Sequence, residues 1–298
     1  MKIAAAAYPL ERLPDWAAYD AKVSAWVADA AGQGADLLVF PEYGAMELAS
    51  LGGAAVAADL EASLTEVARH TDAMAALFAR VAAAHDVHVL APSAPVAAGA
   101  GRPVNRAVLY GPHGMIGHQD KQIMTRFERE EWHIAPGTGL TLFDTALGRI
   151  GVLICYDAEF PLLARALVEA GAQILLVPSA TDSYAGYTRV RVGAMARALE
   201  NQCVVVQSPT VGAAAWCEAM DMNVGAAAIY GPPDHGFPED GILAQTRLNL
   251  PGWAVAEVSL AAVEHVRRAG GVLNHLHWAE QPARLVHGVK HADGAVSA

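Results

Sequence analysis

The chain has 298 residues, of which 54% are hydrophobic and 17% are charged, and this is enough to bury a large core in one or two domains. Its 20 basic and 31 acidic side chains give a net charge of −11. Such an acidic excess argues against binding to nucleic-acid phosphates or to an anionic membrane surface, so neither partner is expected.

No apolar run is long enough to predict a membrane-spanning helix. The first residues, MKIAAAAYPLERLPDW, predict an opening strand rather than a signal peptide, because charged residues soon follow the apolar run. The three cysteines form no CxxC pair. An odd number of widely spaced cysteines favours free thiols in a reducing cytoplasm over a disulfide framework.

Taken in chain order, the first half alternates short apolar runs with amphipathic segments. The apolar runs predict strands at 3–8, 36–40 and 87–90, and helical spacing of apolar residues predicts helices at 16–33 and 60–84. A hairpin is predicted over 104–118, around the turn GPHG. Residues 119–139 are polar, aromatic and irregular, and they predict a long loop.

The same alternation resumes in the second half. Strands are predicted at 149–155, 173–177, 203–207, 224–230, 242–249 and 253–258, and helices at 160–170, 187–200 and 260–268. This order predicts an α/β fold in which helices cover mixed sheets. We expect one domain over 1–265 and a C-terminal extension over 266–298 that packs on the body or on a partner subunit and ends in a loose tail.

Four side chains could carry chemistry. Cys155 ends the apolar run GVLIC, and helix N–H groups at that place would lower the pKa of its thiol. Glu42 follows the run DLLVFP, and Lys121 and Glu128 lie in the polar segment GHQDKQIMTRFEREEW. Each has an ordinary explanation as well: a small buried thiol, a charge at the rim of a sheet, or a solvated charged loop.

Other reactive residue types are less informative. Cys203 lies inside the strand pattern CVVVQ and Cys217 in a segment rich in Gly and Ala, so both are expected to be structural. His275 and His277 would share one face of a strand as a possible metal pair, but no further ligand is evident beside them. No metal site is therefore expected.

Together, FPE at 40–42, Lys121 with Glu128, and GVLICYDAEFP at 151–161 resemble the nitrilase superfamily of carbon–nitrogen hydrolases. The pieces occur in the family's order and rough spacing. The segment RVRVGAMARALENQCVVVQSPTVG at 189–212 resembles the family's Arg-Ala-x-Glu-Asn segment. The chain is most similar to an amidase-like branch with a TRFERExW-type stretch after the lysine.

The resemblance implies a four-layer αββα sandwich of mixed sheets that forms a homodimer or larger homo-oligomer through helices flanking the nucleophile. It also implies a Glu–Lys–Cys triad of Glu42, Lys121 and Cys155, with Glu128 as the second glutamate, and no metal or organic cofactor. In that chemistry Cys155 attacks an amide carbon and Glu42 moves the proton. Lys121 and the backbone N–H of Tyr156 would hold the oxyanion.

The pair Tyr156-Asp157 after the cysteine looks more like the family's amidases than its nitrilases, in which Trp-Glu is usual. A small amide is therefore the expected substrate. A nitrile, or a non-catalytic binding role for the same fold, remains an alternative. Tyr184, Tyr187 and Arg189 are candidates to bind the substrate, because they lie in or near a predicted loop at 181–188. An arginine there could pair with a substrate carboxylate, the alternative being an ordinary surface arginine.

Overall fold

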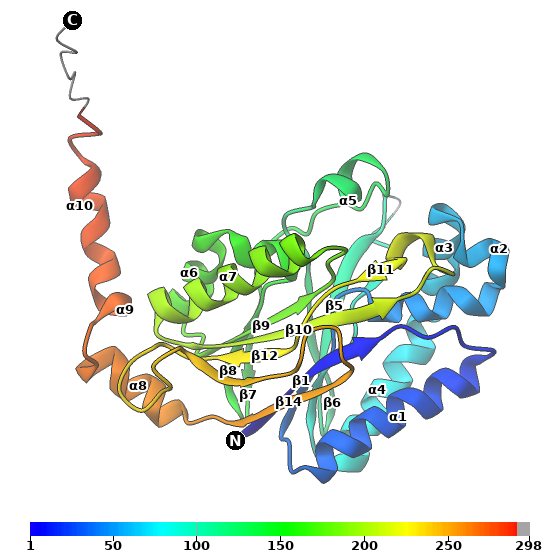
Figure 1. Ribbon diagram of the computed structural model, residues 1–298, viewed down its shortest axis with the longest axis horizontal. Coiled ribbons are helices and arrows are strands. Elements are labelled where there is room, and N and C mark those ends of the chain that lie inside the picture. Colours follow the sequence, from blue (N-terminus) through cyan, green and yellow to red (C-terminus); the bar gives the residue numbers. More distant parts are fainter. Residues whose placement is uncertain (100, 291–298) are drawn as a thin grey trace, which may run out of the picture.

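The computed structural model describes residues 1–99 and 101–290. The strands along its main sheet are β1 (Lys2–Pro9), β2 (Leu37–Val39), β3 (His88–Leu90), β4 (Ala94–Val96), β5 (Val104–Gly111), β7 (Leu142–Thr145), β8 (Gly148–Val152), β9 (Ile174–Ser179) and β10 (Val204–Ala213). Their spatial order is β4-β5-β3-β2-β1-β10-β9-β8-β7. Strand β1 pairs in parallel with β2, and with β10 over Tyr8 and Pro9, so it joins two halves of one mixed sheet (Figure 1).

Further strands extend this sheet through antiparallel pairs. They are β6 (Gly114–Asp120), β11 (Met222–Asn223), β12 (Ala228–Tyr230), β13 (Ile242–Gln245) and β14 (Gly252–Glu257). Strand β6 forms the expected hairpin with β5, and β14 pairs with β1 along Lys2–Ala7.

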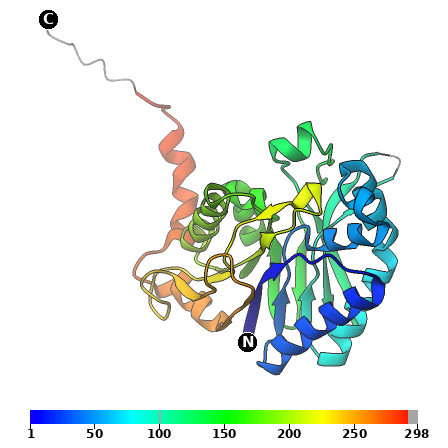
Figure 2. The same ribbon diagram turned by 45° about the vertical axis from the view of Figure 1, so that its right-hand side comes forward.

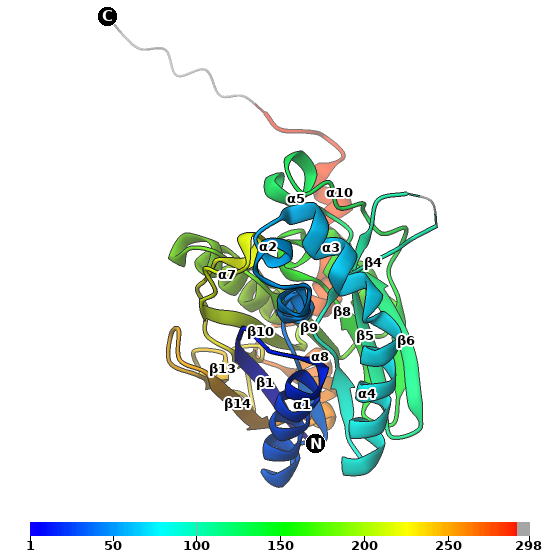
Figure 3. The ribbon, with the colours of Figure 1, turned by 90° about the vertical axis from the view of Figure 1, so that its right-hand side faces the viewer.

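Helices cover both outer faces of the sheets. The α-helices are α1 (Trp16–Gly32), α2 (Ala54–Ala57), α3 (Leu60–Arg69), α4 (Thr71–His85), α5 (Arg126–Glu130), α6 (Pro161–Glu169), α7 (Tyr184–Asn201), α8 (Leu260–Ala269), α9 (Asn274–His277) and α10 (Gln281–Leu285). Short 3₁₀ helices are η1 (Gly44–Gly52), η2 (Cys155–Glu159), η3 (Glu218–Met220) and η4 (Trp278–Glu280). Helices α1 and α4 lie against one half of the sheet and α6 and α7 against the other (Figures 2 and 3). The expected layering of mixed sheets between helices is confirmed.

The alternation of side chains along β1 explains the two cores. Ile3, Ala5 and Ala7 point into a core shared with β8, β9 and β10, while Ala4, Ala6 and Tyr8 point toward α1 and α4. Because successive side chains of a strand face opposite sides, this central strand is buried on both faces. Its small alanines are fully buried.

Two predicted helices differ from the structure in their bounds. The helix predicted over 60–84 is divided into α3 and α4 at His70, whose backbone dihedrals of −95° and 2° leave the helical range. Apolar spacing continues across the break, so the pattern alone indicated a single helix. The helix predicted from Tyr187 begins at Tyr184, because the Ser183 side chain caps it by accepting from the N–H of Gly186.

The strand predicted to end at Cys155 stops earlier. Strand β8 ends at Val152, and Cys155 is the first residue of η2, with a φ of 50°. A positive φ is uncommon for a residue other than glycine, and it marks a sharp turn of the chain. The thiol therefore lies on a bend between strand and helix rather than within the strand.

The C-terminal segment contains helices. Helix α8 crosses the predicted boundary at 265, and α9 and α10 follow it. The carbonyl of His275 accepts from the Arg165 guanidinium on α6 at 3.2 Å, so the start of the extension packs on the body. Figure 1 shows α10 leading away from it. The tail predicted at the end falls on residues 291–298, outside the described residues.

His275 and His277 lie on α9, so the prediction that they share a strand face is wrong. Within residues 1–99 and 101–290 no group of three or more His, Cys, Asp or Glu side chains is arranged to hold a metal ion. No helix of this described part is both long and apolar enough to cross a membrane.

The contact between α7 and η2 gives a test of the fold. A Cβ atom built on Gly193 would lie 3.0 Å from the carbonyl oxygen of Ala158, so a larger residue must push α7 away from the turn that carries Cys155. We expect Gly193→Val to lower the free energy of unfolding by about 1–3 kcal/mol, the usual cost of overpacking. Urea denaturation measures it.

Gly139→Val is the matched control, because a Cβ atom there meets nothing within 4 Å. Equal stability of the two variants would contradict this close packing.

Candidate active site

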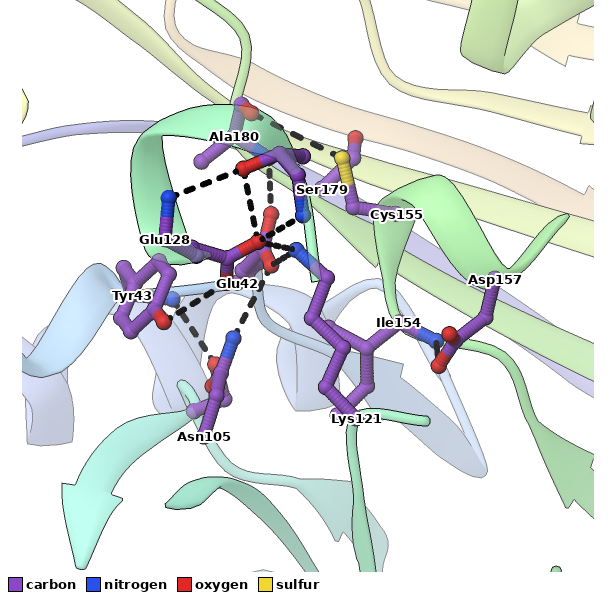
Figure 4. A network of polar contacts seen from close by, with 12 residues as sticks. Glu42, Tyr43, Asn105, Lys121, Glu128, Ile154, Cys155, Asp157, Ser179 and Ala180 are labelled. Carbon is purple, nitrogen blue, oxygen red and sulfur yellow. Dashed lines mark hydrogen bonds and ion pairs between the residues drawn. The ribbon is translucent and has the colours of Figure 1, made fainter. Parts of the chain in front are cut away.

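One cavity of about 580 Å³ contains the four side chains that the sequence indicated. Glu42 follows β2, Lys121 follows β6, Glu128 lies on α5 and Cys155 begins η2. These segments lie far apart in the sequence, and the sheet brings their ends together, as Figure 4 shows. Ends of neighbouring strands are where α/β sheets commonly gather reactive groups.

Lys121 is held between two carboxylates. Its Nζ donates to Oε1 of Glu42 at 2.8 Å and to Oε2 of Glu128 at 2.6 Å, and its side chain is only 1% exposed (Figure 4). Burial alone would lower the pKa of Lys121, but the carboxylates of Glu128 and Glu42 outweigh it and raise the pKa well above the usual value. The lysine is therefore a fixed ammonium ion.

Both carboxylate oxygens of Glu42 are engaged. Oε1 accepts from Lys121 and from the Asn105 side-chain amide at 2.9 Å, and Oε2 accepts from the N–H of Ala180 at 2.9 Å. Burial raises the pKa of Glu42 to about 7, although Lys121 opposes that shift. A carboxylate with a pKa near neutrality, fixed in orientation, can both accept and return a proton.

Glu128 is the second carboxylate, and it differs from Glu42. Its Oε2 accepts from the N–H and hydroxyl of Thr125, both at 2.9 Å, and its Oε1 accepts from the Tyr43 hydroxyl at 2.8 Å. Burial would raise the pKa of Glu128, but Lys121 and these hydrogen bonds hold it below the ordinary value. Glu128 is thus a permanent anion that keeps the Lys121 ammonium in place.

Cys155 lies beside Glu42. Its Sγ donates to the carbonyl oxygen of Ala180 at 3.6 Å. Burial, and after it the Glu42 carboxylate, raise the pKa of the thiol well above its usual value. The expectation that helix N–H groups lower this pKa is wrong, because desolvation and a neighbouring negative charge dominate. The resting side chain is a neutral thiol next to a base.

Asp157 connects the two halves of the site, and the sequence did not assign it this part. Its carboxylate accepts from the backbone N–H groups of Gln122 at 3.1 Å, Ile123 at 2.8 Å and Ile154 at 3.3 Å. The segment after Lys121 is thereby tied to the turn before Cys155. Burial raises the pKa of Asp157 to about 6. In the sequence, its position two residues after Cys155 was the only indication that Asp157 belongs to the site.

The other predicted site residues divide into two groups. Tyr156 and Arg189 line the cavity, whereas Tyr184 and Tyr187 are not among the described residues that do. Tyr184 is exposed. Tyr187 is buried, and its hydroxyl accepts from the Gln245 side chain at 3.3 Å. Tyr43 and Asn105 contact the reactive groups without having been predicted, because only the folded chain brings them near Glu42 and Glu128.

The carbon-nitrogen hydrolase family model matches residues 2–268 of this chain. The probable hydrolase YhcX of Bacillus subtilis is 32% identical over 272 residues, which cover 91% of this chain and 52% of that protein. The chain thus spans about half the length of that relative. The deaminated glutathione amidase of Yersinia enterocolitica is 42% identical over 92 residues, covering 31% of this chain and 32% of that protein.

Solved structures share the fold. Saccharomyces cerevisiae Nit3, a member of branch 10 of the nitrilase superfamily, has a TM-score of 0.71 and 20% identity, covering 90% of this chain and 93% of its own. An amidase mutant from Nesterenkonia sp. AN1 has a TM-score of 0.69 and 23% identity, covering 96% and 97%. That structure has the acetamide moiety of fluoroacetamide covalently added at the active site cysteine.

The buried ion cluster predicts a stability defect that depends on pH. Lys121→Met would leave Glu42 and Glu128 without their shared cation, and breaking a buried ion pair from one side costs about 3–5 kcal/mol. The loss raises the folded-state pKa of both carboxylates above the unfolded values. Stability is then greatest at low pH and falls as the pH rises through those raised pKa values.

Urea denaturation of Lys121→Met from about pH 5 to about pH 8 checks this expectation. Lys290→Met, at an exposed lysine, is the control. A Lys121→Met protein as stable as this control across the range would contradict the ion cluster.

Proposed function

Because the chain belongs to the carbon–nitrogen hydrolase family, we propose that it hydrolyses the C–N bond of a small amide through a thioester on Cys155. The observation that carries the proposal is the ammonium of Lys121, fixed between Glu42 and Glu128 in the cavity that also contains the thiol. Breaking an amide needs a nucleophile, a proton carrier and a stabiliser of the oxyanion, and these residue types supply all of them.

In the first half of the reaction, the Cys155 sulfur attacks the carbonyl carbon and Glu42 takes the thiol proton. The carbonyl π electrons move to oxygen. A lysine ammonium has three N–H donors. Among the described residues, Lys121 gives two of its donors to Glu42 and Glu128, so the third can donate to this oxygen. The backbone N–H of Tyr156 is the proposed second donor.

In the second half, the C–N bond breaks while Glu42 returns its proton to the leaving nitrogen, and ammonia or an amine departs. Water then attacks the thioester carbon, Glu42 accepts a proton from it, and the proton returns to the sulfur as the C–S bond breaks. The products are a carboxylic acid and the free thiol. The pKa of about 7 for Glu42 suits a group that must act alternately as base and acid.

Two alternatives share the same fold. A nitrilase would act on a nitrile with the same cysteine, and a non-catalytic member would only bind a partner. A binding protein has no need for a lysine buried between two carboxylates, since such a cluster is costly to desolvate. The Tyr156-Asp157 pair after the nucleophile, typical of the family's amidases, favours an amide over a nitrile.

An ammonia-release screen tests the proposal on amides, ω-amides, carbamoyl compounds and nitriles. Deaminated glutathione belongs in the panel, because several matching relatives are named for that amidase activity. Release from an amide supports the proposal, and release from nitriles alone favours the nitrilase. No release, and no acyl adduct on Cys155, would favour the binding protein.

The three free cysteines support a reducing compartment such as the cytoplasm.

The nucleophile assignment predicts opposite results for two cysteines. Cys155→Ala should fold normally and abolish turnover, and mass spectrometry of the wild-type protein with substrate should find the acyl group on Cys155. Cys203→Ala is the matched control: that thiol is also buried, its pKa is raised to about 12 by burial, and it lies outside the cavity lining. An adduct on Cys203, or full activity in Cys155→Ala, would refute the assignment.

The ionisation of Glu42 predicts the acid limb of the pH profile. If ionised Glu42 is the base, kcat/KM should rise with pH through an apparent pKa of about 7. Asn105→Ala removes a donor that favours the charged carboxylate, so the pKa of Glu42 should rise and the limb should move to higher pH. Asn274→Ala on α9 is the control, and an unmoved limb in Asn105→Ala would argue against Glu42 as the base.

We also propose that the protein forms a homodimer or larger homo-oligomer through α6 and α7. Leu162, Val192 and Leu199 on these helices are exposed, with Leu162 at 72%. Exposed apolar side chains gathered on neighbouring helices favour a protein interface.

The double substitution Leu162→Glu, Val192→Glu should convert the assembly to monomers in light scattering at micromolar concentration. Met115→Glu, at an exposed apolar position on β6, should leave it assembled. A wild-type protein that is strictly monomeric would contradict the proposal.

A further inference from the structure

Beyond its reactive groups, the cavity is lined by more acidic than basic side chains. The carboxylates are Glu159, Asp182, Glu218 and Asp221, and the guanidinium groups are Arg126 and Arg189. Arg126 is exposed and already makes two hydrogen bonds to Glu130, at 3.0 and 2.8 Å. One of the two guanidinium groups thus already pairs with a carboxylate outside the lining, and the four lining carboxylates outnumber the guanidinium groups.

Glu159 is the most enclosed of these carboxylates. It is the last residue of η2, four positions after Cys155, and its side chain is 21% exposed. Burial raises the pKa of Glu159, while the charges of Arg189 and Lys121 lower it, so Glu159 lies within electrostatic reach of the reactive lysine.

The charged partner of Glu159 lies too far away to donate a hydrogen bond. The Nε of Arg189 lies 3.8 Å from its Oε1, beyond hydrogen-bond distance, and the Arg189 side chain is 63% exposed. Among the hydrogen bonds of the described residues, none reaches the Glu159 carboxylate. A partly buried carboxylate that lacks a close donor is stabilised by a cation that enters the cavity.

We infer that the cavity selects amides whose far end carries a positive charge, such as an alkylammonium group, and that Glu159 is the specificity residue that contacts this charge. This inference rests on the proposed amide hydrolysis. It also changes the expectation for Arg189. Rather than pairing with a substrate carboxylate, Arg189 competes with the incoming cation for Glu159, so its removal should strengthen the preference for cationic amides.

Three amides with the same four-methylene spacer isolate the charge. They are δ-aminovaleramide, hexanamide and adipamic acid, which end in an ammonium, a methyl and a carboxylate group. We expect kcat/KM to be highest for δ-aminovaleramide and lowest for adipamic acid. One charge pair several ångström apart in a partly exposed site changes a rate or affinity by roughly tenfold. A preference for adipamic acid, or equal values for all three, would overturn the inference.

Variants then assign the preference to Glu159. Glu159→Gln should lower the ratio of kcat/KM for δ-aminovaleramide over adipamic acid by about tenfold and leave hexanamide nearly unchanged. Arg189→Gln should raise that ratio. Glu239→Gln, at an exposed carboxylate outside the cavity lining, is the control and should leave the ratio unchanged. An equal loss for all three amides in Glu159→Gln would show a structural role instead.

A second measurement does not depend on turnover. Methanethiosulfonate reagents that transfer aminoethyl, propyl or sulfonatoethyl groups to Cys155 are compared with their rates on free mercaptoethanol, with Cys155 labelling followed by mass spectrometry. The cationic reagent should be favoured in the wild type and less so in Glu159→Gln. If no amide is hydrolysed, the proposed function fails and these rates alone decide the charge preference. An unchanged reagent preference in Glu159→Gln would overturn the inference.

Discussion

The structure around the cavity depends on one buried cation between two buried anions. Taking Lys121, Glu42 and Glu128 out of water separately would cost far more than a folded domain can offset. The arrangement is tolerable because every charge has close partners. Lys121 donates to both carboxylates, Asn105 and the backbone N–H of Ala180 also donate to Glu42, and Tyr43 donates to Glu128. Since each group needs the others, the ends of β2 and β6 and helix α5 are fixed together.

The same constraint explains the state of the thiol. Lys121 is occupied by the two glutamates, so at Cys155 burial and the negative charge of Glu42 prevail, and the thiol stays protonated. In the proposed reaction, this neutral thiol is activated only when it attacks, and its proton then has a defined acceptor in Glu42. Asp157 keeps this geometry by joining the backbone after Lys121 to the turn before Cys155.

Motif and periodicity predicted much of this arrangement. Apolar runs located the buried strands, and the order of FPE, the lysine segment and GVLICYDAEFP indicated which strand ends would meet. The structure places Glu42, Lys121, Glu128 and Cys155 in one cavity, whereas their roles stay predictions. The proposed nucleophile was expected at a strand end, but local spacing cannot show the positive φ that turns the chain at Cys155.

What the sequence could not predict depends on distant contacts. Asn105 and Tyr43 reach the glutamates only across the folded sheet. Tyr187 was a candidate for substrate binding because of its place near a loop, yet its hydroxyl is used by Gln245 within the body. The break between α3 and α4 is likewise invisible in the apolar spacing, which continues through it.

The kinetics of Lys121→Ala test the central claim most directly, provided that circular dichroism shows the variant folded under the assay conditions. If Lys121 stabilises the oxyanion, kcat and kcat/KM should fall together by at least about a hundredfold, since one such donor is worth roughly 10²–10³ in kcat. Lys121→Arg should recover little, because a planar guanidinium cannot take the place of an ammonium. A folded Lys121→Ala enzyme within about threefold of the wild type would contradict the account.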